Sequence, residues 1–512
     1  MKSRILTFFT AIALLAALSV SVQTAAQNNH RPTHHHYQLI DVGTFGGPSS
    51  STQDELKVLN RRGVLTGGAD TSTLDPNFPN VCAFCGPFID HAFQWKDGSL
   101  IDLGALPGLN TSSANSISES GLSAGFSENG EIDPIFGIPA IHAVLWKSGR
   151  IIDLGTLEGG YESAAFNVNS RGQVAGFSLN LVPDPIFGVQ ERTFLWDKDG
   201  GMQDLGTLGG NDAGIISGPP VNKGNVEINE RGQVVACSTT NTIINPTTGL
   251  PTIDPFRWDK EGGMQDLGTF GGTIGCAVNL NSRGQVVGYS NLAGDTAAHP
   301  FLWDRGMLVD LGTFGGDIGV ATAINEAGDA VGAATLPGDQ VQHAALWRRS
   351  EKTDLGTVDD DPCSGADAIN SNQQVVGGGD DCQRGNHVAF LWENGVPMVD
   401  LNTLVPPGSG LFLQFAININ DRGEISGEGV LSNGDNHAFL LIPCDEGHPG
   451  IKGCDYSMVD ASVATSAASR PFVENPTTAK PWITGAADPM MHFFSHRSMP
   501  WYRNLGVQTQ PK

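Results

Sequence analysis

The sequence predicts an all-β fold, a closed β-propeller of four-stranded antiparallel blades, and three observations carry this prediction. Gly is abundant, at 66 of 512 residues, and no sustained apolar stripe at helical spacing is present, which favours strands and tight turns. Four short apolar runs recur in a fixed order along the chain. The way these runs begin and end the chain fits a closed ring.

The four runs, called A to D, are joined by links typical of antiparallel strands. Run A precedes an Asn, run B follows a Gly, run C ends in Trp, and run D ends in Asp-Leu-Gly. The A–B link is usually Asn-x-x-Gly, as at Asn281 and Gly284. In such a turn the Asn side chain can accept a hydrogen bond from the backbone two residues on, while Gly takes the left-handed conformation. Each unit is therefore predicted to be a four-stranded meander.

The repeat length indicates propeller blades. The Asp residues that mark run D are separated by 44 to 62 residues, a spacing that suits four strands per unit. They lie at Asp41, Asp102, Asp153, Asp204, Asp266, Asp310, Asp354 and Asp400. We expect these carboxylates to cap the Gly turn that follows them. The His residues that open run C in register are expected to form structural hydrogen bonds; they are His91, His142, His299, His343 and His437.

The phase of the repeat predicts how the ring closes. The chain opens with a lone D run at 37–42, completes A–B–C–D seven times, and ends with A–B–C alone. Pairing the first run with the last unit would remove two exposed sheet edges. The expected propeller spans residues 37–443 and has eight blades, or seven if one irregular unit is not a true blade.

The INxxGxVVG and HAFLW runs, together with DLGTLGG, resemble the extracellular HAF-repeat family. The resemblance covers roughly residues 38–442 and rests on eight copies of the pattern. It implies a secreted repeat protein, and it supplies no established activity and no catalytic residues.

Both ends of the chain lie outside the repeats. Residues 1–26 have the charged start, apolar run and small-residue site of a secretory signal peptide, with a membrane anchor as the alternative. Its removal takes away Lys2 and Arg4, so the net charge moves from -25 to -25 - 2 = -27. Such acidity excludes nucleic acid and anionic lipid as partners. We expect a secreted or periplasmic monomer with no membrane span after cleavage. Residues 444–512 are expected to be a mostly disordered tail, or a segment that docks on a partner or cell surface.

Eight cysteines in an exported chain predict disulfides. Cys363 and Cys382 flank an A–B hairpin symmetrically, so they should lie opposite each other and pair. Cys82 and Cys85 have CxxC spacing, for which a local loop disulfide is expected over a redox or zinc site. The remaining disulfide candidates are Cys237, Cys276, Cys444 and Cys454.

The candidate binding surface is the face that carries the D–A and B–C loops. The B–C loops of units one to four are long, and function concentrates in such loops on a rigid scaffold. Three of them share an Asp-Pro-x-Phe motif, in which the stiff Pro could hold an apolar side chain outward. Alternatively, each Phe folds back to plug its own loop. The motif residues are Asp75, Phe78, Asp133, Phe136, Asp184 and Phe187.

A calcium site is a further hypothesis, at unit seven. Its D–A and B–C loops carry five carboxylates, which a Cys363–Cys382 bridge would hold together: Asp359, Asp360, Asp361, Asp380 and Asp381. Like charges so close repel unless a cation lies among them, and calcium takes 6–8 oxygen ligands. The alternative is that the five carboxylates point apart into solvent.

The sequence thus predicts a non-enzymatic, exported propeller that binds a ligand or protein partner through its loop-rich face. The motifs of serine hydrolases, zinc proteases and nucleotide-binding enzymes do not occur, and no catalytic residue is assigned. The alternatives are a secreted polysaccharide lyase or hydrolase that uses the same loops, and a structural envelope component.

Overall fold

The structure, a computed structural model, describes residues 33–52, 56–78, 87–108, 111–134, 137–184, 188–216, 221, 224–348, 351–358, 361–382, 387–393 and 395–460. The predicted signal peptide and residues 461–512 of the predicted tail lie outside these ranges. So do six residues of the predicted sites: Cys82, Cys85, Phe136, Phe187, Asp359 and Asp360.

The described residues are all-β, as predicted, apart from one short 3-10 helix, η1 at Leu401–Thr403. Six antiparallel sheets of four strands are present in this part of the chain. The first three contain β3 (Gly46–Ser51), β4 (Leu65–Leu74), β5 (Phe88–Lys96) and β6 (Ser99–Asp102); β7 (Ser112–Ile117), β8 (Ser123–Ile132), β9 (Pro139–Lys147) and β10 (Arg150–Gly155); β11 (Gly160–Val168), β12 (Val174–Asp184), β13 (Gly188–Asp197) and β14 (Gly201–Asp204).

The next two units form one nine-stranded sheet, because β18 and β20 meet in a parallel contact at Ile253 and Ile274. Its strands are β15 (Ala213–Gly214), β16 (Glu227–Ile228), β17 (Val234–Thr239), β18 (Ile253–Asp259), β19 (Gly263–Asp266), β20 (Gly271–Leu280), β21 (Val286–Leu292), β22 (Ala298–Asp304) and β23 (Met307–Asp310).

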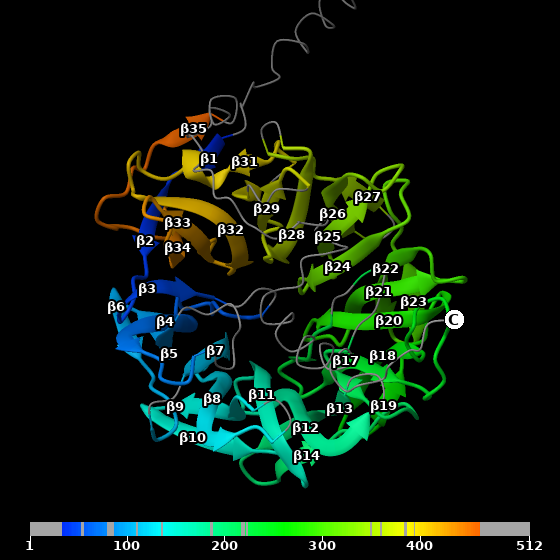
Figure 1. The fold of residues 1–512 in the computed structure, drawn as a ribbon. Coiled ribbons are helices and arrows are strands. Elements are labelled where there is room, and N and C mark those ends of the chain that lie inside the picture. The colour runs from blue at the N-terminus through cyan, green and yellow to red at the C-terminus, as the bar shows by residue number, and fades with distance from the viewer. Residues whose placement is uncertain are drawn as a thin grey trace, which may run out of the picture.

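The last three four-stranded sheets complete the repeat region. They contain β24 (Gly319–Ile324), β25 (Ala330–Thr335), β26 (Gln342–Arg348) and β27 (Glu351–Asp354); β28 (Cys363–Ile369), β29 (Val375–Asp380), β30 (Val388–Trp392) and β31 (Val399–Asp400); β32 (Leu411–Ile419), β33 (Ile425–Leu431), β34 (Asn436–Pro443) and β2 (Tyr37–Asp41). In Figure 1 the sheets follow one another in chain order around a common centre.

The predicted pairing of the first run with the last unit is present. β2 lies antiparallel to β34, with Tyr37 opposite Pro443 and Asp41 opposite Phe439. The Asp41 carboxylate also contacts His437 Nδ1 at 2.7 Å and accepts from the backbone N–H of Gly43. The same His–Asp contact recurs within four other sheets, and it joins His91 to Asp102, His142 to Asp153, His299 to Asp310, and His343 to Asp354. The structural roles predicted for both residue types are therefore confirmed in these sheets.

The Asn of the A–B turn links neighbouring units as well as closing its own turn. Asn281 Oδ1 accepts from the backbone N–H of Arg283, as the sequence predicts, while Gly284 has φ +80°. Its Nδ2 donates to the carbonyl of Asn325 in the next unit. Equivalent bonds run from Asn60 to Ser118, Asn169 to Asn229, Asn229 to Asn281, Asn325 to Asn370, Asn370 to Asn420, and Asn420 to Asn60. The last of these connects the final unit to the first.

The close approach of neighbouring strands explains why run B contains a Gly. A Cβ at Gly288 would lie 2.0 Å from the carbonyl oxygen of Cys276 on the neighbouring strand, so no larger residue fits there without a shift. The Trp that ends run C lies between units: Trp347 is buried, and its Nε1 donates to the carbonyl of Gly312 in the preceding unit. These contacts build the core along the seams between sheets.

Residues just outside the repeats also form strands. β1 (Thr33–His35) pairs with β35 (Met458–Asp460), and Cys444 is bonded to Cys454. His34 is fully buried, with Nδ1 2.8 Å from Glu393 Oε1. Burial would raise the pKa of Glu393, but hydrogen bonds from His34 and Gln374 hold it below its ordinary value. The sequence did not predict the pairing of β1 with β35, because a three-residue strand has no periodicity to detect.

Candidate functional site

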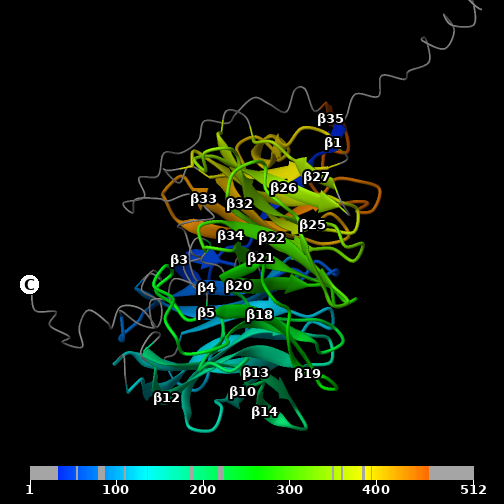
Figure 2. The ribbon, with the colours of Figure 1, turned by 90° about the vertical axis from the view of Figure 1, so that its right-hand side faces the viewer.

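Four long B–C connections form arms at one face of the molecule. In the first three, the strands continue past the sheet as paired ribbons, so that Leu74 lies opposite Phe88, Ile132 opposite Pro139, and Asp184 opposite Gly188. The fourth runs from β17 to β18 without strands of its own. We call the described residues within 70–90, 128–141, 179–191 and 240–252 the arms. In the side view, β4, β5 and β12 lie toward the left-hand side of the molecule (Figure 2).

The arms carry a concentration of exposed large apolar side chains. Of the twelve such residues in the described part of the chain, seven lie on the arms, and the aliphatic ones there are 45–76% exposed. They are Leu74, Phe78, Ile132, Leu181, Val182, Ile243 and Ile244. Single exposed apolar residues are normal, but grouped ones mark interaction sites.

The predicted binding residues divide between the arm surface and its base. Phe78 is 47% exposed, so it points outward rather than plugging its loop. Asp75, Asp133 and Asp184 are buried instead. Asp75 accepts from the backbone N–H of Asn77 at 2.7 Å, and Asp184 accepts from Asn211 Nδ2 at 3.0 Å. These carboxylates therefore brace the arms rather than face a partner.

Sequence reasoning missed the aliphatic residues that the arms expose. Leu74 and Ile132 occupy the same position, directly before the Asp-Pro pair, whereas Val182 precedes it by two residues and Leu181 by three. The shared signal was available, because an aliphatic residue precedes this motif in all three arms. It was overlooked because the Phe of the motif is the larger side chain.

Buried carboxyl groups lie at the base of the third arm. Glu191 accepts from the backbone N–H of Ile215 at 2.6 Å, and Asp212 accepts from the backbone N–H of Glu191 at 2.9 Å. Burial raises the pKa of Glu191 to about 8 and that of Asp212 to about 7, and the neighbouring Asp184 adds to the rise at Asp212. Their backbone partners indicate that these groups hold the β13 arm against the following unit.

The proposed calcium cluster is only partly within the described residues. The predicted Cys363–Cys382 disulfide is present, and a further disulfide joins Cys237 to Cys276. Asp380 lies close to both sulfurs of the first bridge, but disulfide sulfurs are not available as metal ligands. Asp380 accepts from the backbone N–H of Cys382 at 2.6 Å, and burial raises its pKa. Asp361 is buried and Asp381 is half-buried, and calcium binding stays a prediction.

The opposite face has a central cavity that the sequence did not predict. Its volume is about 260 Å³, and the first strands and A–B turns of the units line it. Inside it, Glu227 Oε2 accepts from Asn167 Nδ2 at 2.8 Å. Burial raises the pKa of Glu227 to about 8, although Lys57 opposes the rise.

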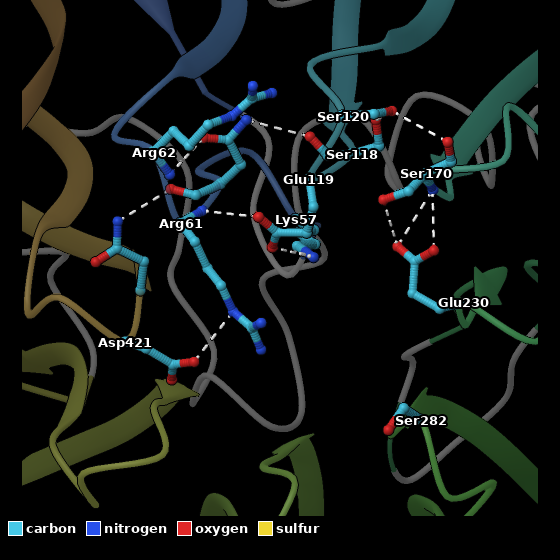
Figure 3. Close-up of polar contacts among 12 residues, drawn as sticks. Lys57, Arg61, Arg62, Ser118, Glu119, Ser120, Ser170, Glu230, Ser282 and Asp421 are labelled. Atoms are coloured by element: carbon cyan, nitrogen blue, oxygen red, sulfur yellow. Dashed lines mark hydrogen bonds and ion pairs between the residues drawn. The ribbon is translucent and has the colours of Figure 1, made fainter.

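The rim of this cavity alternates in chemistry from one unit to the next. The second residue of each A–B turn is Arg or Ser in odd units and an acid in even units (Figure 3). In each odd unit the backbone N–H of this second turn residue donates to the acid of the following unit. The bonds run from Arg61 to Glu119, Ser170 to Glu230, Ser282 to Glu326, and Ser371 to Asp421.

Two basic residues of the first unit complete the rim. Lys57 lies 2.8 Å from Glu119, and Arg61 Nε lies 3.1 Å from Asp421, so they neutralise the acids on either side. Because every rim acid is engaged by a neighbouring unit, we assign this face a role in holding the units together. The arms are therefore the better candidate for binding.

In the described residues we find no helix with the length and apolarity needed to span a bilayer. No protein-family model matches the chain, and no curated protein matches it. Among solved structures, hydrazine synthase of Kuenenia stuttgartiensis is similar with 10% identity and a TM-score of 0.33, over 63% of this chain. The chain spans about half of that protein, at 46%.

An ulvan lyase of polysaccharide lyase family PL25 is also similar. Its complex with a GlcA–Rha3S oligosaccharide has 8% identity and a TM-score of 0.34, and a second structure of a PL25 ulvan lyase has 8% identity and a TM-score of 0.33. Each likeness covers 84% of this chain and 100% of the lyase. At these TM-scores the likenesses carry no argument about fold or activity.

Proposed function

We propose that the protein is an exported, closed eight-bladed β-propeller of the HAF-repeat type that binds a protein partner through its arms. Ring closure is supported by the pairing of β2 with β34 and by the bond from Asn420 to Asn60. Export is supported by the three disulfides, since such bonds persist in oxidising compartments.

The observation that carries the binding role is the concentration of exposed apolar residues on the arms. Six of the seven are aliphatic, and aliphatic anchors gain binding energy by burial against another apolar surface. The ribbons that present them are hydrogen-bonded and braced at their bases, so little conformational entropy is lost on binding.

The composition of the arms also indicates the hydrophobicity and charge of a complementary partner. Residues 70–90, 128–141, 179–191 and 240–252 contain no Lys or Arg, most of their Asp and Glu side chains are buried, and the chain as a whole carries a net charge of -25. A partner segment that is apolar and basic would complement this surface in both hydrophobicity and charge.

Replacing three arm residues should abolish binding without unfolding the protein. In the variant Leu74→Ser, Ile132→Ser, Leu181→Ser, we expect partner affinity to fall at least about 100-fold, because anchors of this kind contribute ~1–2 kcal/mol each. The melting temperature should hardly change, since all three side chains are more than half exposed. The measurement is capture of the partner from the surface of the producing cells, its identification by mass spectrometry, and titration of the purified partner.

A matched control is available on the outer strands. Ile101, Met307 and Val309 are 41–63% exposed and lie on β6 and β23, away from the arms. Their replacement by Ser removes a similar exposed apolar area and should leave binding intact. Equal affinity of the arm variant and the wild type would rule out the arms as the binding surface.

A further inference from the structure

The C-terminal segment of this chain has the chemistry that the arms call for. Residues 490–503 contain seven apolar or aromatic side chains, two Arg, two His and no acid. Residues 461–512 carry five Lys or Arg and two acids, a net charge of +3, so residues 1–460 carry -25 - 3 = -28. The apolar residues are Met490, Met491, Phe493, Phe494, Met499, Trp501 and Tyr502.

We infer that residues 490–503 bind the arms of the same molecule and cover their apolar side chains until a partner displaces them. The inference rests on the proposed function, because both require the arms to be a binding surface. The apolar residues of the segment meet the exposed aliphatic side chains of the arms, and its Arg residues meet no basic residue there.

The tether is long enough for this contact. The described chain ends at Asp460 in β35, which pairs with β1 at the edge of the ring of sheets (Figure 1). Residues 461–489 number 29, which extend to ~95 Å at roughly 3.3 Å per residue. A compact domain of this size has a radius of gyration of ~22 Å, so the segment can reach any part of the surface.

Tethering also favours a contact within one molecule over a contact between two. A tethered segment meets its site at an effective concentration in the millimolar range, well above a typical protein concentration. Even a weak contact would therefore be largely formed in the monomer. An external partner would have to compete with this segment. Its apparent affinity would be the intrinsic affinity multiplied by the fraction of molecules whose arms are uncovered.

Hydrogen–deuterium exchange on the full chain tests the inference. In wild-type protein, peptides from 490–503 should exchange slowly relative to peptides from 461–480. In the variant Leu74→Ser, Ile132→Ser, Leu181→Ser they should exchange at least about tenfold faster, and in the control variant Ile101→Ser, Met307→Ser, Val309→Ser they should stay slow. Equal exchange in wild type and arm variant would overturn the inference.

The reciprocal variant reports on the arms themselves. Replacing Phe493, Phe494 and Trp501 with Ser should raise binding of an apolar dye severalfold and should tighten binding of the external partner. If the partner binds the tail variant and the wild type equally, the segment does not cover the arms, while the proposed function stands. If the arm variant keeps its partner, the proposed function itself fails.

A second copy of the chain is the competing occupant. Protection of 490–503 that rises with protein concentration, together with a doubled mass by light scattering, would show binding between molecules and overturn the inference. Protection independent of concentration, at the mass of a monomer, is the expected result.

Discussion

Deleting Tyr37 to Val42 should lower the free energy of unfolding by at least about 5 kcal/mol. The deletion removes β2, which pairs with β34 at five positions, and it exposes the edge of the last sheet. Tyr37 and Val42 are buried, and Leu39 and Ile40 contact the core in part, at ~1.5–3 kcal/mol for each fully buried side chain. Because a domain is stable by only about 5–15 kcal/mol, this loss approaches the whole margin.

Denaturant unfolding followed by circular dichroism measures the effect. The control is a deletion of residues 461–512, which removes many more residues but no described strand. We expect the control to change the unfolding free energy by less than about 2 kcal/mol. Similar losses in the two deletions would contradict ring closure by β2.

Neutralising Glu227 should flatten the dependence of stability on pH. Burial raises the pKa of Glu227 to about 8 in the folded protein, whereas a free Glu titrates near 4.5. The folded state therefore keeps this proton up to about pH 8, while the unfolded chain loses it near pH 4.5. The contribution of Glu227 to stability is complete below about pH 4.5 and is lost as the pH rises to about 8.

In the variant Glu227→Gln, the unfolding free energy at pH 8 should rise by on the order of 3–5 kcal/mol, since one pKa unit corresponds to about 1.4 kcal/mol. The amide oxygen can still accept from Asn167, so the contact in the cavity is kept. Unfolding measured at intervals from pH 4.5 to pH 8.5 tests this. Glu230→Gln removes the same formal charge from the exposed rim three residues on and serves as the charge control. A wild-type slope in Glu227→Gln would contradict the assignment.

The sequence was informative wherever one repeat could be compared with the next. The order of the four runs predicted the strand order, and the lone first run predicted the partner of β34. Hairpin symmetry predicted the Cys363–Cys382 bond. These features depend on position within the repeat, and position can be read directly from a sequence.

Contacts between repeats were much harder to foresee. The sequence indicated that Asn281 closes its turn, but nothing in one unit shows that its Nδ2 reaches the carbonyl of Asn325. Likewise, Leu74 and Asp75 are adjacent in the sequence, and only the folded chain shows that the carboxylate is buried and the Leu side chain exposed. Such outcomes depend on three-dimensional packing between segments, which repeat spacing does not report.

The alternating rim has a consequence for how this chain can change its length. Each Arg or Ser in an odd unit contacts an acid in the next even unit, so the seams between units are of two kinds. Gain or loss of a single repeat would place two acids, or two residues without an acid, side by side. A gene that grew by copying a pair of repeats would avoid this mismatch. We therefore expect related chains to differ in repeat number by steps of two.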